Sequence, residues 1–189
     1  AEVRRVTLTN HGKEAVDRKD VNVYARSTNG GRSFTSAAGS PLTLPVDIEH
    51  SERYVASDDH FPARSITLDG NDDPVIAVQP YGKAHEIVRF DHRSKEWTAP
   101  EPSPNGAAKL VNDGRGSIWA FSSGPTVFRS PDKPPFRWQL VAQSGGQWGH
   151  PRVVYDEREK AFYLHLLRCR DWARADRRVG ARQVLRGRA

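Results

Sequence analysis

Three aspartates recur along the chain at a nearly constant interval, and each separates two short apolar segments. Asp69, Asp113 and Asp156 are 44 and 43 residues apart. The paired segments are I-T-L-D-G before P-V-I-A-V, L-V-N-D-G before S-I-W-A-F, and V-V-Y-D before F-Y-L-H-L. A repeat of about 40–45 residues that contains two hairpins has the length of one four-stranded propeller blade. The interval therefore predicts an all-β chain, a β-propeller of four-stranded antiparallel blades.

A second type of hairpin alternates with these segments, and its clearest copy spans Val21–Thr35. Residues 21–26 alternate between apolar and polar side chains, which is the period of a strand with one buried face. The Asn-Gly-Gly sequence at 29–31 tolerates the positive φ that a tight turn requires. The Ser27 hydroxyl and the Asn29 amide can bond the backbone of the same turn. This stretch therefore predicts a β-hairpin.

Weaker copies of this hairpin follow later in the chain. Residues 127–132 repeat the strand, the Arg-Ser pair and an acid, and Trp138 follows them. Residues 87–91, followed by Trp97, form another copy that lacks the serine. Together the two types of hairpin indicate about three and a half blades.

The repeats divide the chain into a partial propeller, residues 1–167, and a tail. A closed ring needs more blades than this, so we expect either a piece of a longer propeller or two copies that close the ring together. The chain starts at Ala1 and contains no Met, which also indicates a processed or cut product. We expect blade pieces at about 1–36, 60–100, 107–142 and 150–167, a long loop at 37–59, and an arginine-rich tail at 168–189.

The positive charge of the chain is concentrated in this tail. Residues 168–189 contain eight arginines and two acids, which accounts for the whole formal net charge of +6 and leaves residues 1–167 neutral overall. A basic tail can bind nucleic acid, but this one contains a single aromatic residue, Trp172, and lacks interleaved stacking platforms. We interpret the tail as a solvated terminal segment and do not expect a nucleic-acid partner. A nucleic-acid-binding arm is the alternative.

Two further features limit the class of protein. No stretch approaches the roughly 18 apolar residues that a membrane-spanning helix needs, so we expect no membrane partner. Cys169 is the only cysteine, so no disulfide can form within the chain, and we interpret its thiol as structural. The sequence also gives no reason to expect a metal or a cofactor.

Basic residues and histidines recur where the innermost strand of each blade is expected to start. In a propeller these starts surround one mouth of the central channel. Cations and histidines that converge there suit an acidic substrate and proton transfer. The alternative is a set of solvated polar residues on a loop-rich face. The candidate catalytic residues are His60 and His150, and the candidate substrate-binding residues are Arg64, Lys109, Arg152, Tyr81 and Trp148.

Four motifs in residues 18–167 resemble the bacterial-neuraminidase-repeat proteins. S-x-N-x-G-x-S-F, starting at Ser27, is similar to their Asp-box, S-x-D-x-G-x-T-W, with Asn29 in place of Asp and Phe34 in place of Trp. The segments A-A-G-S-P-L-T-L-P, S-I-T-L-D-G and R-F-D-H-R-S-K-E-W follow in the family's order. The chain looks most like the secreted bacterial group that includes sialidase-like proteins and propeller polysaccharide lyases.

This resemblance implies a six- to eight-bladed propeller, secreted or periplasmic, that acts on or binds a carbohydrate. The Asp-box is structural in that family, so it supports the fold and not the activity. The family's F-R-I-P motif is absent, which counts against a sialidase. Family lyases use a His or Tyr base with an Arg that neutralises a uronate. His60, Arg64, His150 and Arg152 are of these types, although no position-by-position match exists.

The sequence therefore supports one leading hypothesis and one main alternative. The leading hypothesis is a carbohydrate-active propeller, a glycoside hydrolase or polysaccharide lyase that acts on an acidic glycan. The alternative is a non-catalytic propeller that binds a glycan or a protein, which needs no converging acid and base.

Overall fold

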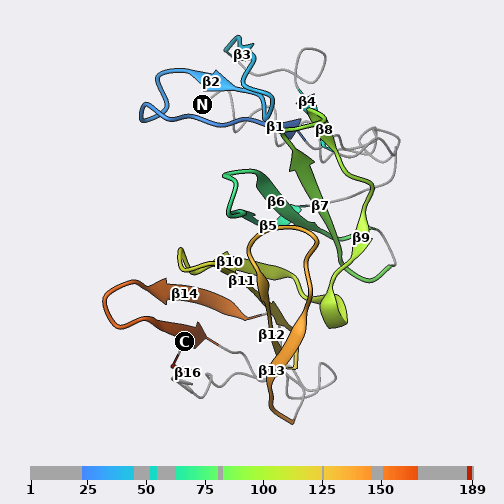
Figure 1. Ribbon diagram of the computed structural model, residues 1–189, viewed down its shortest axis with the longest axis vertical. Helices are drawn as coiled ribbons and strands as arrows, with labels where there is room; N and C mark the ends of the chain where they lie inside the picture. The colour runs from blue at the N-terminus through green and yellow to red at the C-terminus, as the bar shows by residue number, and fades with distance from the viewer. Residues whose placement is uncertain are drawn as a thin grey trace, which may run out of the picture.

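The chain is all-β in the part that the computed structural model describes, which is residues 23–44, 52–54, 63–80, 83–124, 126–145, 151–165 and 187–188 (Figure 1). These residues contain no α-helix and only one short 3-10 helix, Pro104–Gly106. Within them, no helix has the length and apolar character to cross a membrane. The strands form several separate sheets, and every strand pair in them is antiparallel.

The sheets follow the order of the chain. Two small sheets come first, one pairing β1 (Val23–Tyr24) with β4 (Glu52–Arg53) and the other pairing β2 (Phe34–Thr35) with β3 (Pro41–Leu42). The β5–β9 sheet contains β5 (Ala63–Leu68), β6 (Pro74–Val78), β7 (Glu86–Asp91), β8 (Glu96–Trp97) and β9 (Glu101–Pro102). The β10–β13 sheet contains β10 (Lys109–Asn112), β11 (Ser117–Ser122), β12 (Thr126–Pro131) and β13 (Gln139–Gln143). The β14–β16 sheet contains β14 (Arg152–Asp156), β15 (Ala161–His165) and β16 (Gly187–Arg188).

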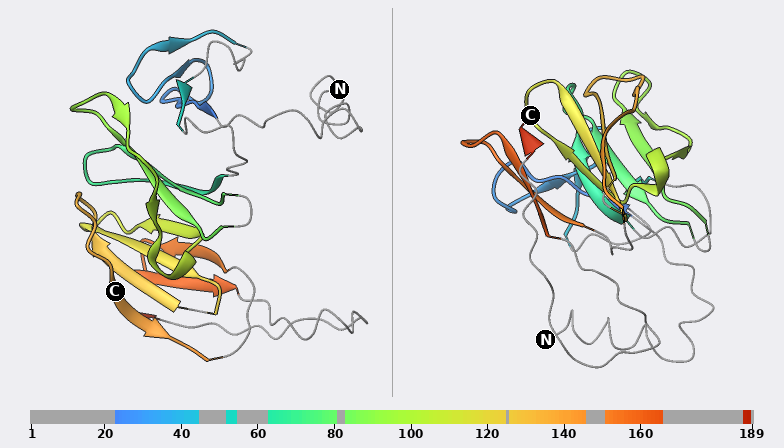
Figure 2. Two further views of the ribbon diagram at one scale, coloured as in Figure 1. Left: turned by 90° about the vertical axis from the view of Figure 1, so that its right-hand side faces the viewer. Right: turned by 90° about the horizontal axis from the view of Figure 1, so that it is seen from below.

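The predicted repeat therefore corresponds to one sheet. The β10–β13 sheet is a four-stranded meander in which each strand pairs with the next along the chain. Two of the strands lie in the interval 37–59, where a long loop was expected, and β16 lies in the arginine-rich tail. The described residues do not close into a ring or a barrel (Figure 2).

Successive sheets pack face to face, and Figure 2 shows them one after another along the molecule. Three apolar clusters join them. The first consists of Tyr24, Tyr54, Ile76, Val78 and Val88. The second consists of Val75, Ala77, Ile87, Ala107, Leu110, Ile118 and Ala120. The third consists of Trp119, Phe121, Phe162 and Leu164.

The second strands of the two large sheets are buried on both faces because of this stacking. Every residue of β6 and of β11 is buried. Since successive side chains of a strand point to opposite faces, Val75 and Ile76 belong to different clusters, and so do Ile118 and Trp119. The continuous apolar runs P-V-I-A-V and S-I-W-A-F have this cause.

The first strands of successive sheets lie side by side and run in the same direction. The backbone N–H of Leu110 donates to Ser65 Oγ at 3.0 Å, and that of Asn112 donates to Thr67 Oγ1 at 3.1 Å. Both residue numbers rise together along these bonds, so β5 and β10 are parallel neighbours. β10 in turn contacts β14. The three first strands therefore gather at one side of the stack.

The recurring aspartates hold the turns between first and second strands. Asp69 Oδ1 accepts backbone N–H groups from the residues two and four positions later at 2.8 and 3.0 Å, and Asp113 Oδ1 does the same at 2.8 and 3.1 Å. Asp156 caps a longer turn, because six residues separate the paired Tyr155 and Phe162, whereas five separate Asn112 and Ile118. Asp113 and Asp156 are 43 residues apart, whereas Ile118 and Phe162, which follow them in the second strands, are 44 apart. The added turn residue accounts for this difference of one.

The expected turn at residues 27–34 is confirmed, including its internal bonds, but the predicted two-stranded hairpin is not: β1 pairs with β4, β2 pairs with β3, and the two arms share a single bridge between Arg26 and Thr35. Residues 21 and 22 lie outside the described residues. Arg26 and Thr35 exchange backbone hydrogen bonds of 2.9 and 2.8 Å. Ser27 Oγ accepts the N–H of Gly31 at 2.8 Å, and Asn29 Oδ1 accepts the N–H groups of Arg32 and Ser33 at 3.1 and 3.0 Å. The φ angles of Gly30 and Gly31 are 70° and 84°, so both residues use the conformational freedom that the sequence indicates.

In the first strand, the face that is buried is not the one that carries the valines. Tyr24 is 6% exposed, whereas Val23 is 36% exposed. The reason is an aromatic cluster: the Tyr24 ring lies 5.5 Å from that of Trp97, which also contacts Tyr54 and Phe90. Burying a large ring in such a cluster outweighs burying one valine, because an aromatic side chain removes more apolar area from water.

Candidate functional site

Three of the predicted binding residues lie near the starts of the first strands. Arg64 is the second residue of β5, Lys109 the first of β10 and Arg152 the first of β14. Because Ser65 is bonded to Leu110, the register places Arg64 beside Lys109 on the neighbouring parallel strand. We call Arg64, Lys109 and Arg152 the basic row.

The charges of the basic row have no carboxylate partner within the described part of the chain. Arg64 is exposed, and its Nε donates to the amide oxygen of Gln79 at 2.9 Å, an oxygen that its Nη2 also contacts. Lys109 is half-buried and Arg152 is exposed. No ion pair of these three residues with a described acid is formed. Three like charges at neighbouring strand starts therefore favour an anion at this place.

The same strands carry acids at their other ends. Asp69 follows β5, Asp113 follows β10, and Asp156 is the last residue of β14. Each acid follows the cation of its strand by four or five residues, so the two lie roughly 13–17 Å apart along the strand. One end of the row of first strands is thus positive and the other negative. An anionic ligand is attracted to the starts of the strands and repelled from their ends.

The remaining predicted site residues are not placed. His60, Tyr81, Trp148 and His150 all lie outside the described residues. Asp58 and Asp59, which precede Arg64 by six and five residues, also lie outside them. The structure thus places the three cations near the starts of β5, β10 and β14, and the predicted channel mouth and its two histidines stay a prediction.

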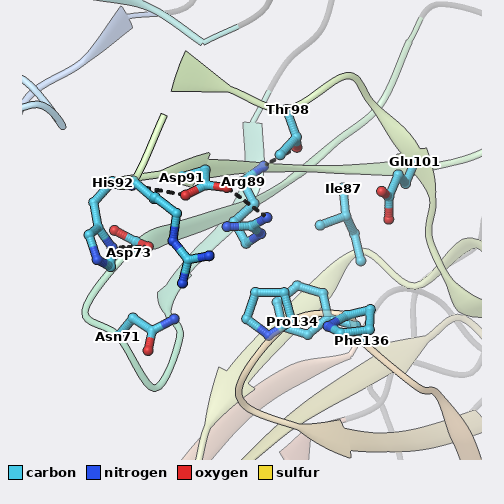
Figure 3. A pocket seen from close by; sticks show the side chains of 12 residues that line it. Asn71, Asp73, Ile87, Arg89, Asp91, His92, Thr98, Glu101, Pro134 and Phe136 are labelled. Atoms are coloured by element: carbon cyan, nitrogen blue, oxygen red, sulfur yellow. Dashed lines mark hydrogen bonds and ion pairs between the residues drawn. The ribbon is translucent and has the colours of Figure 1, made fainter. Parts of the chain in front are cut away.

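A second feature, which the sequence did not suggest as a site, is a cavity of about 530 Å³ between β7 and residues 134–136 (Figure 3). We call it the lateral cavity. One wall belongs to the β5–β9 sheet and carries polar side chains. The other belongs to the loop after β12 and carries Pro134, Pro135 and Phe136. Residues about 45 positions apart in the chain therefore form its two walls.

The polar wall contains a histidine held by a buried carboxylate. His92 Nδ1 lies 2.7 Å from Asp73 Oδ2, and Asp73 is buried. The carboxylate can only accept when it is ionised, so Nδ1 carries the proton and Nε2 of a neutral His92 is an acceptor. The His92 side chain is 61% exposed, which leaves this nitrogen accessible.

Next to this pair, Arg89 and Asp91 project from the same face of β7. The Arg89 side chain is 17% exposed; its Nη1 donates to the carbonyl of Phe90 at 3.2 Å, and its Nη2 lies 3.9 Å from Asp91 Oδ2. The backbone N–H of Arg93 donates to Asp91 Oδ1 at 2.9 Å. This bond, together with the Arg89 charge, holds the pKa of Asp91 below its ordinary value. Asp91 is therefore an ionised acceptor at neutral pH.

One pattern in the sequence marks the polar wall. Ile87, Arg89 and Asp91 alternate with Val88 and Phe90, which are fully buried on the opposite face of β7. A strand that buries one face and carries an arginine and an acid on the other has a polar surface there. The sequence did not show what covers this surface, because Pro134 and Phe136 come from the next sheet.

Comparisons with known proteins do not assign the chain to a family. No protein-family model matches the chain, and no curated protein matches it either. Among the described residues, no group of three or more His, Cys, Asp or Glu side chains could hold a metal ion. The resemblance to neuraminidase-repeat proteins therefore stays an expectation.

Proposed function

We propose that the chain is part of a β-propeller whose sheets are the blades. Three features support this proposal. The β10–β13 sheet is a four-stranded meander of the length of one repeat. Successive sheets pack face to face through apolar clusters. The first strands, β5 and β10, run parallel side by side, as the innermost strands of neighbouring blades do.

On this scaffold, we propose a carbohydrate-active protein that acts on an acidic glycan bound at the basic row. The observation that carries the proposal is the register that places Arg64 beside Lys109, with Arg152 at the start of the next first strand. Each charge-assisted hydrogen bond to a carboxylate contributes about 1.5–3 kcal/mol. A polymer with a carboxylate on successive sugars can bind more than one of these cations.

His60 and His150 are the proposed acid and base, since they lie within four residues of Arg64 and Arg152 in the sequence. If His60 and His150 act as acid and base, the protein is a hydrolase or a lyase that uses no metal or cofactor. Without turnover it is a glycan-binding propeller. An extracellular or periplasmic location agrees with such a substrate.

Isothermal titration with a uronate-containing oligosaccharide tests the binding proposal. Arg64→Ala, Lys109→Ala and Arg152→Ala should each weaken binding about tenfold or more. Arg115→Ala is the matched control, because Arg115 is an exposed arginine at the acidic ends of the strands. Equal affinity of all four variants and the unchanged chain would remove the basic row from any role in binding.

The same oligosaccharide separates an enzyme from a binding protein. New reducing ends indicate hydrolysis, and new unsaturated sugar ends that absorb in the ultraviolet indicate elimination. His60→Ala and His150→Ala should abolish either product while the variants still bind the oligosaccharide. Tight binding by the unchanged chain without any product would favour the non-catalytic alternative.

A further inference from the structure

The lateral cavity is separate from the basic row and differs from it in charge. The basic row carries three cations, whereas the lateral cavity combines the guanidinium groups of Arg89 and Arg93 with three carboxylates. In Figure 3, Arg89 points into the space between β7 and Pro134, while Asp91 lies beside it and Glu101 stands farther along the same wall. Opposite charges thus alternate along the polar wall.

This mixture disfavours a ligand that carries a net charge. An anion at the guanidinium groups also meets the carboxylates of Asp91 and Glu101, and a cation at the carboxylates also meets Arg89 and Arg93. A hydroxyl group suits both, because it donates to a carboxylate and accepts from a guanidinium. A neutral ligand with several adjacent hydroxyls therefore fits this wall best.

The hydrogen-bonding groups needed for such a ligand are present. His92 offers Nε2 as an acceptor, since Nδ1 is engaged with Asp73 at 2.7 Å. Arg89 has five N–H donors, and one of its nitrogens, Nη1, is bonded to a backbone carbonyl. Its Nη2 lies 3.9 Å from Asp91 Oδ2, and this largely buried guanidinium lines the cavity. Acceptors and donors thus stand next to each other on a wall fixed by the β7 strand.

The opposite wall supplies an apolar surface. Pro134 and Phe136 face the polar wall across the cavity (Figure 3), and Pro135 also lines it. Phe136 is half-buried and is held by Trp138, whose ring centre is 5.8 Å from its own. Sugar rings have an apolar C–H face that packs on such surfaces, and a volume of about 530 Å³ is within the usual range of small-molecule sites.

We propose that the lateral cavity is a second ligand site and that it binds a neutral pyranose ring, with its hydroxyls on the polar wall and its C–H face on Pro134 and Phe136. The inference does not depend on the function proposed for the basic row. It assigns to the chain a site for uncharged sugar units, formed between two successive sheets.

Titration of the whole chain with methyl glycosides tests this inference. The probes are the methyl pyranosides of glucose, galactose and mannose. Their binding is measured by isothermal titration and by changes in the NMR signals of the His92 ring. At least one glycoside should bind and shift these signals. Glu101→Gln and Arg93→Ala should each weaken that binding about tenfold, because each removes a charged hydrogen-bonding partner. Both residues are exposed, so neither variant should alter the fold.

The matched controls are Glu96→Gln and Arg115→Ala, exposed residues outside the cavity that should leave binding unchanged. Lys109→Ala should also leave it unchanged, while weakening uronate binding if the basic row acts as proposed. The inference is overturned if no neutral glycoside binds, or if the cavity variants and the controls behave alike. Methyl glucuronide and methyl glucosaminide form the last arm: tighter binding of either charged sugar, lost in Arg93→Ala or Glu101→Gln, would also overturn it.

Discussion

The two recurring aspartates Asp69 and Asp113 have the same turn geometry but different environments, which allows a matched prediction. Both accept two backbone N–H groups through Oδ1. Asp113 Oδ2 also accepts the indole N–H of Trp119 at 2.9 Å. Asp69 Oδ2 is buried without a hydrogen-bond partner in the described part of the chain. We therefore expect Asp113→Ala to destabilise the fold more than Asp69→Ala.

The magnitude follows from the donors that each substitution leaves without an acceptor. A buried donor without a partner costs about 1–3 kcal/mol. Asp113→Ala leaves two buried donors, the backbone N–H of Ser117 and the indole N–H of Trp119, so its cost is about 2–6 kcal/mol. Asp69→Ala leaves one, the backbone N–H of Asp73, and also removes a buried oxygen that no group satisfies. Its cost is therefore at most about 1–3 kcal/mol.

Urea unfolding followed by circular dichroism measures this difference, with Trp119→Phe and the double variant completing a cycle. The phenyl ring of Trp119→Phe retains an aromatic contact with Phe162, which lies 4.9 Å from the indole. A coupling energy of about 1.5–3 kcal/mol between Asp113 and Trp119 is expected for a hydrogen bond to a charged group. Equal unfolding free energies of the two alanine variants, or a coupling near zero, would refute the reasoning.

Two further predictions concern the turns. Gly31→Val should lower the unfolding free energy by about 1–3 kcal/mol, because it places a β-branched residue at a φ of 84°; Gly145→Val, where no positive φ is required, is the control in thermal unfolding. Burial is the largest influence on Asp69 and raises its pKa above the ordinary value, so its contribution to stability is present below about pH 4 and is lost as the pH rises through the higher folded-state pKa. Asp69→Asn should remove this part of the pH dependence, and unchanged curves of unfolding free energy against pH would contradict it.

The strands and turns follow from the sequence because they depend on local chemistry. The acids at 69, 113 and 156 and the turn of residues 27–34 form hydrogen bonds within a few residues, so their spacing alone indicates them. The buried side of β1 did not follow, because it depends on Trp97, a residue far away in the chain. Alternation fixes that a strand has two faces, and the packing partner decides which one is buried.

The candidate sites separate in the same way. The repeat interval predicted basic residues at successive strand starts, and the bond between Ser65 and Leu110 fixes the register of β5 against β10. The lateral cavity was not predictable, because its polar wall is an ordinary strand face until Pro134 and Phe136 of the next sheet cover it. A site between two sheets depends on how the sheets stack, and the local sequence pattern of either sheet does not indicate this stacking.

The same stacking bears on the proposal of a larger ring. On β10, Val111 is half-buried because it packs against the cluster that joins its sheet to β15. The equivalent residue of β14, 43 positions later, is Val154, and it is 64% exposed. At Val154 the β14–β16 sheet thus exposes to solvent an apolar side chain whose counterpart in the preceding sheet is half-buried. A further blade, from another stretch of chain or from a second copy, would cover Val154 and gain about 25 cal/mol for each Å² of apolar surface removed from water. The β14–β16 sheet could therefore pack against a further sheet through Val154, as the β10–β13 sheet packs against β15 through Val111.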